Sequence, residues 1–161
     1  MVGSLSFSAA TAGRDNSGVS RIAEGVLPLV ARILMCGVFI PAALSKAFGW
    51  QGNADYMRAH GMPLVPLFLG AALVVEVVGP LCLIVGYRAR VAALVMALYL
   101  VPVSFIFHPI AQGGGAQTGF LKNVGLIGGL LMIAAFGAGT LSLDARRRHL
   151  QALNSPPPVA K

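Results

Sequence analysis

Of the 161 residues in the chain, 57% are hydrophobic and 11% are charged, and the mean hydropathy is +0.79. This composition excludes a soluble globular monomer, which carries about 25% charged residues, and a disordered chain, which cannot leave so much apolar surface in water. The net charge of +7 does not indicate nucleic-acid binding, because the basic residues are spread over tails and loops that flank apolar segments. The one class of protein that fits this composition and charge pattern is an integral membrane protein.

Residues 1–24 are rich in Ser, Gly, Ala and Asn and are predicted to form a flexible N-terminal tail. Four apolar segments of about 20 residues follow, each long enough for a helix to cross the roughly 30 Å hydrocarbon core of a bilayer. Because a helix satisfies its own backbone hydrogen bonds in lipid, the sequence predicts an all-α fold, a four-helix transmembrane bundle. The predicted spans are residues 26–48, 64–86, 91–110 and 121–141. They belong to one domain, residues 25–144, and residues 145–161 are predicted to form a basic, proline-rich C-terminal tail.

Lysines and arginines near the ends of the spans predict the orientation of the bundle. Eight lie in the two tails and in the loop between the second and third spans, against three in or beside the other two loops. The eight are Arg14, Arg21, Arg88, Arg90, Arg146, Arg147, Arg148 and Lys161, and the three are Lys46, Arg58 and Lys122. Since cytoplasmic loops carry the excess of basic residues, both termini are predicted to be cytoplasmic. The loops at residues 50–63 and 112–119 then face outward.

Two charged residues fall inside the predicted spans at a distance from their ends. Arg32 and Glu76 lie six and ten residues from the cytoplasmic ends of the first and second spans, so their depths differ by about 6 Å. An unpaired charge at such a depth costs at least about 3 kcal/mol, and we therefore expect Arg32 and Glu76 to form an ion pair. Two interpretations stay open: a structural salt bridge between two helices, or the charged floor of a polar cavity in which Glu76 accepts a proton or contacts a ligand.

A second polar group is predicted at the outward ends of the spans. Lys46 ends the first span, His108 closes the third, and Lys122 and Asn123 open the fourth, while the loop at 50–63 adds further polar candidates. Such a group can hold an anionic head group, a quinone carbonyl or an oxyanion, although lysines at helix ends often serve only as membrane anchors. The candidate ligand-binding residues are thus Arg32, Lys46, Glu76, His108, Lys122 and Asn123. Glu76 and His108 are the candidate catalytic residues.

The sequence holds no HExxH, CxxC, GxGxxG or P-loop motif. The three histidines are His60, His108 and His149, and all lie at or beyond the ends of the predicted spans, on both sides of the membrane. This distribution does not suit the paired axial ligands of a haem or the ligand set of a zinc site. We expect no metal site and no intrinsic cofactor.

Several short stretches, considered in their order and spacing, resemble the DoxX family of small four-helix bacterial membrane proteins. The stretches are LVARILMCGVFIPAALSKAFG at 29–49, HGMP at 60–63, Glu76 followed by LCLIVGYRARVAALVMAL at 81–98, His108 with Pro109, and LKNVGLIGGLLMIAAFGAGTLSLD at 121–144. The resemblance covers roughly residues 26–144. It implies a multi-pass protein of the bacterial inner membrane. It also maps the family's polar residues onto Arg32, Lys46, Glu76, His108 and Lys122, without identifying a catalytic residue among them.

Family resemblance further implies a link to membrane redox systems, since a related family supplies the membrane subunit of a thiosulfate:quinone oxidoreductase and other members are linked to thiol and oxidative-stress complexes. The first hypothesis is therefore a subunit or accessory of a quinone-linked redox system. In it, His108 or Lys122 hydrogen-bonds a quinone oxygen, Glu76 with Arg32 relays or balances a proton, and a partner protein supplies any second redox centre.

The second hypothesis is a non-catalytic bundle that stabilises or assembles another membrane complex through its glycine-rich helix faces. A carrier of solutes or lipids is less expected, because the chain holds no internal repeat. Both hypotheses predict contact with the lipid bilayer and with a membrane-protein partner or a second copy of the chain, and neither involves nucleic acid. Whether the chain is itself an enzyme stays open.

Overall fold

The computed structural model of the chain describes residues 22–154, which form helices joined by short connections, with no strand in that range. In chain order the elements are η1 (Ile22–Val26), α2 (Leu27–Phe48), α3 (Trp50–Ala59), α4 (Val65–Val85), α5 (Ala89–Phe107), η2 (Ile110–Gln112), α6 (Gly114–Phe136) and α7 (Leu143–Asn154). Four of the segments, built on α2, α4, α5 and α6, have the length and apolar composition of membrane spans. The predicted all-α, four-helix transmembrane fold is confirmed. Residues 1–21 of the predicted N-terminal tail lie outside the described residues.

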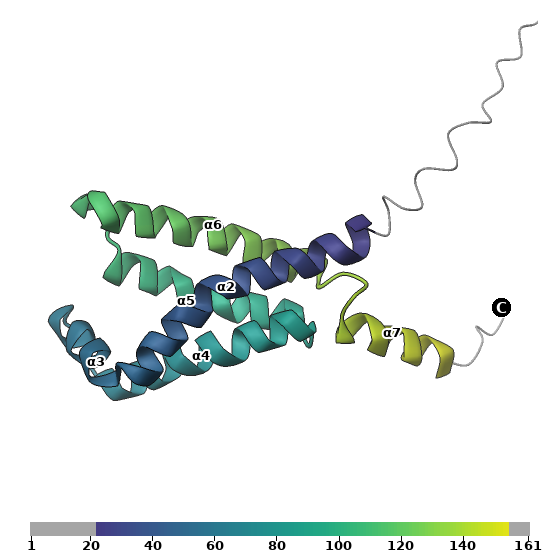
Figure 1. Ribbon diagram of the computed structural model, residues 1–161, viewed down its shortest axis with the longest axis horizontal. Coiled ribbons are helices and arrows are strands. Elements are labelled where there is room, and N and C mark those ends of the chain that lie inside the picture. Colours follow the sequence, from purple (N-terminus) through teal and green to yellow (C-terminus); the bar gives the residue numbers. More distant parts are fainter. Residues whose placement is uncertain (1–21, 155–161) are drawn as a thin grey trace, which may run out of the picture.

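The four long helices pack in sequence order, with α2 against α4, α4 against α5, and α5 against α6 (Figure 1). We call the two ends of the bundle the α3 end and the α7 end. Toward the α7 end, a core of fully buried side chains that includes Cys36, Leu83, Met96 and Leu130 fills the interior. There α2 also approaches α6 closely, because a Cβ on Gly129 would lie 3.1 Å from the sulfur of Met35. Toward the α3 end, α2 and α6 diverge (Figure 1). The bundle is therefore closed in one half and split in the other.

A glycine allows the close approach of three segments at the α7 end. Gly86 ends α4 with a left-handed backbone (φ +69°), and the next N–H, that of Tyr87, donates to the carbonyl of Cys82 at 2.9 Å. A side chain at position 86 would collide with the Cβ of Ser142, in the loop between α6 and α7. Only glycine satisfies both the backbone conformation and this contact.

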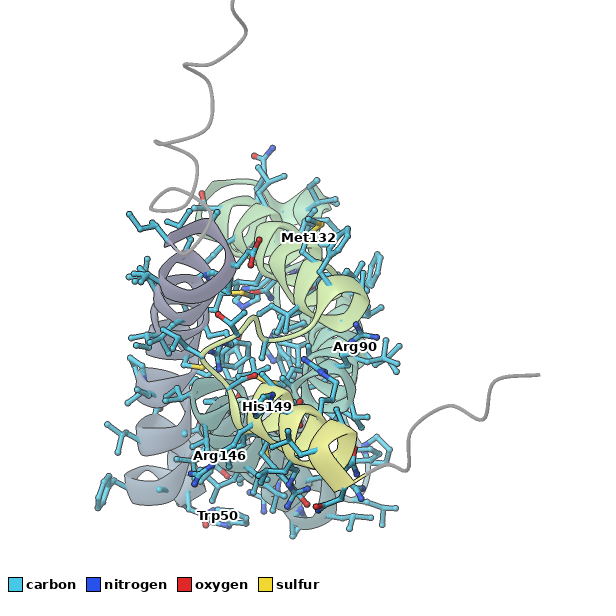
Figure 2. The ribbon with its side chains drawn as sticks, turned by 90° about the vertical axis from the view of Figure 1, so that its right-hand side faces the viewer. Trp50, Arg90, Met132, Arg146 and His149 are labelled. Atoms are coloured by element: carbon cyan, nitrogen blue, oxygen red, sulfur yellow. The ribbon has the colours of Figure 1, made fainter. Side chains whose placement is uncertain are left out.

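Asp144, at the start of α7, ties the same loop to the beginning of α5. Its carboxylate accepts hydrogen bonds from the backbone N–H groups of Arg88 (2.8 Å) and Ala89 (2.9 Å), which have no partner within the first turn of α5. Its own N–H donates to the carbonyl of Gly86 at 2.9 Å. Figure 2, which views the molecule from the α7 end, shows α7 in front of the bundle with Arg146 and His149 on it.

The boundaries differ from the predicted ones in three places. The predicted fourth span was displaced, because α6 begins at Gly114 and ends at Phe136, where Gly137 adopts a left-handed φ of +87°. The first turns of α6 consist of small and polar residues, so hydropathy does not detect that they are helical. For the same reason it missed α3, in the predicted outward loop, and α7, in the predicted C-terminal tail. The last part of that tail, residues 155–161, lies outside the described residues.

Candidate functional site

A cavity of about 720 Å³ lies in the split half of the bundle. Its wall is mostly apolar and includes Phe39, Phe68, Leu100, Ile106 and Leu126, from all four long helices. Residues of α3 cover it at the α3 end. Side chains of both α2 and α6 line the cavity, at the end of the bundle where these two helices diverge (Figure 1). Five of the six candidate residues from the sequence line this cavity, and the exception is Arg32.

Three polar side chains from three helices form what we call the buried triad: Lys46 of α2, Glu76 of α4 and Tyr99 of α5. The ammonium of Lys46 donates to both carboxylate oxygens of Glu76 at 2.9 Å, and the hydroxyl of Tyr99 donates to Oε1 at 2.6 Å. The side chains of Glu76 and Lys46 are 5% and 18% exposed. The two charges cancel, and each carboxylate oxygen has at least one donor, so the buried carboxylate is fully compensated.

The predicted ion pair between Arg32 and Glu76 was wrong. The guanidinium of Arg32, a residue only 1% exposed, instead donates to the backbone carbonyls of Leu83 (2.7 Å), Ile84 (3.1 Å) and Leu141 (2.6 Å). The first two are among the last carbonyls of α4, which lack partners within the helix and form the negative end of its dipole. Arg32 therefore joins the α7 end of α4 to the loop after α6.

The geometry of the helices explains the correction. Side chains on a helix lean toward its N-terminus, so Lys46, in the last turn of α2, extends back into the bundle and reaches Glu76 from the α3 end. Arg32 on the same helix leans away from Glu76 for the same reason, toward the α7 end. The prediction compared only the depths of the two residues along their spans and did not consider the direction in which their side chains lean.

The second polar group, which we call the Asn123 group, consists of Asn123, His108 and Lys122. His108 follows the last residue of α5, and its imidazole lies against α6, since a Cβ on Gly119 would be 2.6 Å from Nδ1. Asn123 lies one helical turn after Gly119 and is 4% exposed, whereas Lys122 is exposed. Among residues 22–154, none provides a hydrogen bond to these three side chains.

Tyr99 was not predicted, because a tyrosine within an apolar segment looks like any other core aromatic residue. Three polar residues of the predicted loop at 50–63, namely Tyr56, Arg58 and His60, lie on α3 or directly after it and divide into two sets. Tyr56 and His60 pack with Phe107 of α5 over the cavity, with ring centroids 5.5 and 5.2 Å from that of Phe107. Arg58, by contrast, pairs with an aspartate on its own helix and faces away from the cavity.

Asn53 fixes α3 in this position. Its amide group donates to the carbonyls of Ser45 and Gly49, both at 2.9 Å, and so joins α3 to the end of α2. The cavity is thus an apolar chamber with a satisfied polar triad at its inner end and unsatisfied polar side chains beside α6. Such a chamber fits a largely apolar molecule that carries one or more oxygen atoms.

Comparisons with known proteins agree with this architecture. The sequence profile of the DoxX family matches residues 27–109, which span α2 to α5. Two similar proteins are inner membrane proteins of Escherichia coli K12: YqjF, 37% identical over 123 residues that cover 75% of this chain and 92% of YqjF, and YphA, 33% identical over 129 residues that cover 77% and 92%.

A more distant similarity, 25% identity over 131 residues, is to the ER-derived vesicles protein ERV29 of Saccharomyces cerevisiae, and it covers 78% of this chain but 35% of ERV29. No solved structure matches the chain. The family match, the two inner membrane relatives and the four apolar helices agree with one another. The chain therefore belongs to the DoxX family and is a multi-pass protein of the bacterial inner membrane.

Proposed function

We propose that the chain is a subunit or accessory of a quinone-linked membrane redox system and that its cavity holds the quinone ring. The observation that carries this proposal is a mostly apolar cavity of about 720 Å³, lined by all four long helices and provided with a few polar side chains. Its volume lies within the roughly 300–1,000 Å³ typical of small-molecule sites. Quinones dissolve in the hydrocarbon phase, and a flat apolar ring with carbonyl oxygens matches such a wall.

Each part of the cavity has a role in this proposal. The apolar walls contact the ring, and the aromatic residues of α3 cover it from the α3 end. His108 and Lys122 lie where they can donate to a ring oxygen, while Lys46 and Tyr99 hold the carboxylate of Glu76 in place as a group that exchanges protons with the cavity. Arg32 has no part in proton transfer here, because it lies at the α7 end. A partner protein supplies the electrons.

The proposal includes an orientation with both termini in the cytoplasm, which places the cavity in the outward half of the membrane. The excess of basic residues in the tails and in the loop between α4 and α5 supports it. Reporter fusions at the C-terminus and within the loop between α3 and α4 test it. A cytoplasmic signal from the loop fusion would reverse the orientation.

Quinone occupancy tests the binding function directly. The full chain is purified in a mild detergent, its lipids are extracted, and quinones are quantified by mass spectrometry. Ala42→Phe places a ring in the cavity, and Ala47→Phe, an exposed site on the same helix outside the cavity, is the matched control. We expect bound quinone in the wild type and the control, a loss of at least severalfold in Ala42→Phe, and reduced occupancy in His108→Ala and Lys122→Ala. Wild-type protein without quinone, or equal occupancy in all variants, would refute the proposal.

A non-catalytic role in assembling another membrane complex is the second candidate. One observation favours it: Gly125 and Gly128 of α6 have no heavy atom within 4 Å of where a Cβ would lie, so a second helix can pack closely on this face. A stoichiometric partner that co-purifies with the wild type and is lost in Gly125→Leu and Gly128→Leu, with quinone occupancy unchanged, supports this candidate. A partner retained in both variants contradicts it.

A further inference from the structure

Asn123 differs from the other buried polar side chains of the structure. Four polar or charged residues are buried among residues 22–154: Arg32, Glu76, Ser104 and Asn123. Arg32 and Glu76 are bonded as described above, and the hydroxyl of Ser104 donates to the carbonyl of Leu100 at 2.6 Å. Asn123 alone of these four has no hydrogen-bond partner for its side chain within the described range. A buried amide without a partner is unfavourable, and native structures contain few of them.

The unpaired amide faces the cavity. Asn123 lines the cavity, and no fully enclosed side-chain nitrogen or oxygen atom in the described part of the chain lacks a partner. The polar atoms of Asn123 are therefore not sealed within the protein, and the residue forms part of the cavity wall. A carboxamide presents two N–H donors and one oxygen acceptor, so it can either donate to or accept from a ligand oxygen.

His108 lies beside it with the same double capacity. Asn123 and Gly119 are four residues apart on one face of α6, and the imidazole rests against Gly119. A neutral imidazole carries one donor and one acceptor nitrogen, whereas the ammonium of Lys122 only donates. The buried triad at the inner end of the cavity does not present a free donor and a free acceptor in this way, because its side chains are already hydrogen-bonded to one another.

The buried triad and the Asn123 group lie at different levels of the bundle. Tyr99 and His108 are nine residues apart on this helix, which corresponds to a rise of about 13.5 Å. Asn123 lies one helical turn further into the bundle than Gly119, so it stands between the level of His108 and that of the triad.

We propose that Asn123, together with His108, binds a ring oxygen of the ligand in both redox forms, donating to the carbonyl of a quinone and accepting from the hydroxyl of a hydroquinone. This inference rests on the proposed function and adds a property to it. A site that can reverse its hydrogen bond retains both forms, as a quinone exchange site requires. A site built on Lys122 alone would offer no acceptor for the hydroxyl hydrogen of the hydroquinone.

The test compares wild type, Asn123→Leu and the control Gln117→Leu, which removes an exposed carboxamide from α6 outside the cavity. Equilibrium binding of ubiquinone-1 and ubiquinol-1 to the purified full chain is measured under anaerobic conditions. We expect the wild type and the control to bind both forms, and Asn123→Leu to bind each about tenfold more weakly. Unchanged affinities in Asn123→Leu, or a loss confined to the quinone, would overturn the inference while the proposed function stands. Wild type that binds neither form refutes the proposed function itself.

Thermal unfolding without added quinone gives a second readout. Leucine fills a similar volume and removes an unpaired buried amide, so Asn123→Leu should melt at the same temperature as wild type or higher. A structural role for Asn123 would instead lower the melting temperature. An increase in stability together with a loss of affinity identifies Asn123 as a ligand-binding residue.

Discussion

Lys46 and Glu76 should be strongly coupled in stability, whereas Arg32 and Glu76 should not be coupled at all. Lys46→Met leaves a carboxylate that is 5% exposed with Tyr99 as its one remaining donor. Removal of one partner from a buried ion pair costs about 3–5 kcal/mol, and the 18% exposure of Lys46 places the expected loss near about 3 kcal/mol. The double variant Lys46→Met/Glu76→Gln has no isolated charge, so it should recover about 2 kcal/mol relative to the sum of the single losses.

The corresponding cycle with Arg32 serves as the matched control. The carbonyls that Arg32 contacts on α4 begin seven residues beyond Glu76, which corresponds to about 10.5 Å along the helix. Arg32 and Glu76 share no partner, so Arg32→Met and Glu76→Gln should be additive within about 0.5 kcal/mol. Arg32→Met alone should still be destabilising, because it removes the side-chain donor of the carbonyls of Ile84 and Leu141.

Both cycles can be measured by unfolding in sodium dodecyl sulfate, followed by the reaction of a thiol-specific dye with Cys36. This thiol is fully buried in the native bundle, and all variants carry Cys82→Ala so that one site reports. A coupling of Lys46 and Glu76 near zero, or a coupling of Arg32 and Glu76 above about 1 kcal/mol, would refute the assignment of ion-pair partners.

Three further predictions concern the contacts around this site. Arg32→Lys should destabilise the bundle by about 2–4 kcal/mol in the same titration, because one ammonium cannot follow the fork of a guanidinium to carbonyls on two segments; a loss below about 1 kcal/mol would contradict the bonding described. Gly119→Ala should reduce quinone occupancy, since its Cβ would lie 2.6 Å from Nδ1 of His108. Gly125→Ala, at an open position of the same helix, is the control and should keep the quinone occupancy while gaining up to about 1 kcal/mol of stability. Equal quinone occupancy in the two alanine variants would disprove the contact between Gly119 and His108. Asp144→Ala should cost about 1 kcal/mol and speed hydrogen exchange in the first turn of α5, as expected when a helix cap is lost; unchanged exchange would show that the cap contributes nothing.

Hydropathy was sufficient to locate the spans whose ends coincide with a change in polarity. The predicted ends of the first two spans lie within one residue of those of α2 and α4, because an apolar run and a helix end together there. In α6 the helix and the apolar run do not coincide. Its first turns, GGAQTGF, are helical but not strongly apolar. Its last turn is followed by a glycine with positive φ rather than by a charged residue. α3 and α7 are helices of mixed composition, for which hydropathy has no signal.

The candidate site was predictable as a set of residues but not as a set of contacts. The rule that a bilayer excludes charge singled out Glu76 correctly as a residue that needs a partner, whereas Lys46 was predicted only as a ligand-binding residue or a membrane anchor. It treated Arg32 as needing a carboxylate, although backbone carbonyls at a helix end serve equally well. The participation of Tyr99 and the unpaired state of Asn123 depend on side-chain directions across three helices, which one sequence does not encode in any local pattern.

The split between α2 and α6 has a consequence for how any ligand arrives. A closed cavity of 720 Å³ that held nothing would cost about 17 kcal/mol at roughly 24 cal/mol per Å³, more than the entire stability of a typical folded protein, about 5–15 kcal/mol. An opening of the cavity to the membrane, as the proposed function requires, would let acyl chains of neighbouring phospholipids fill it without that cost. Binding is then a replacement reaction, in which the incoming molecule displaces a lipid tail. Its measured affinity is a partition ratio that changes with the composition of the surrounding bilayer or detergent.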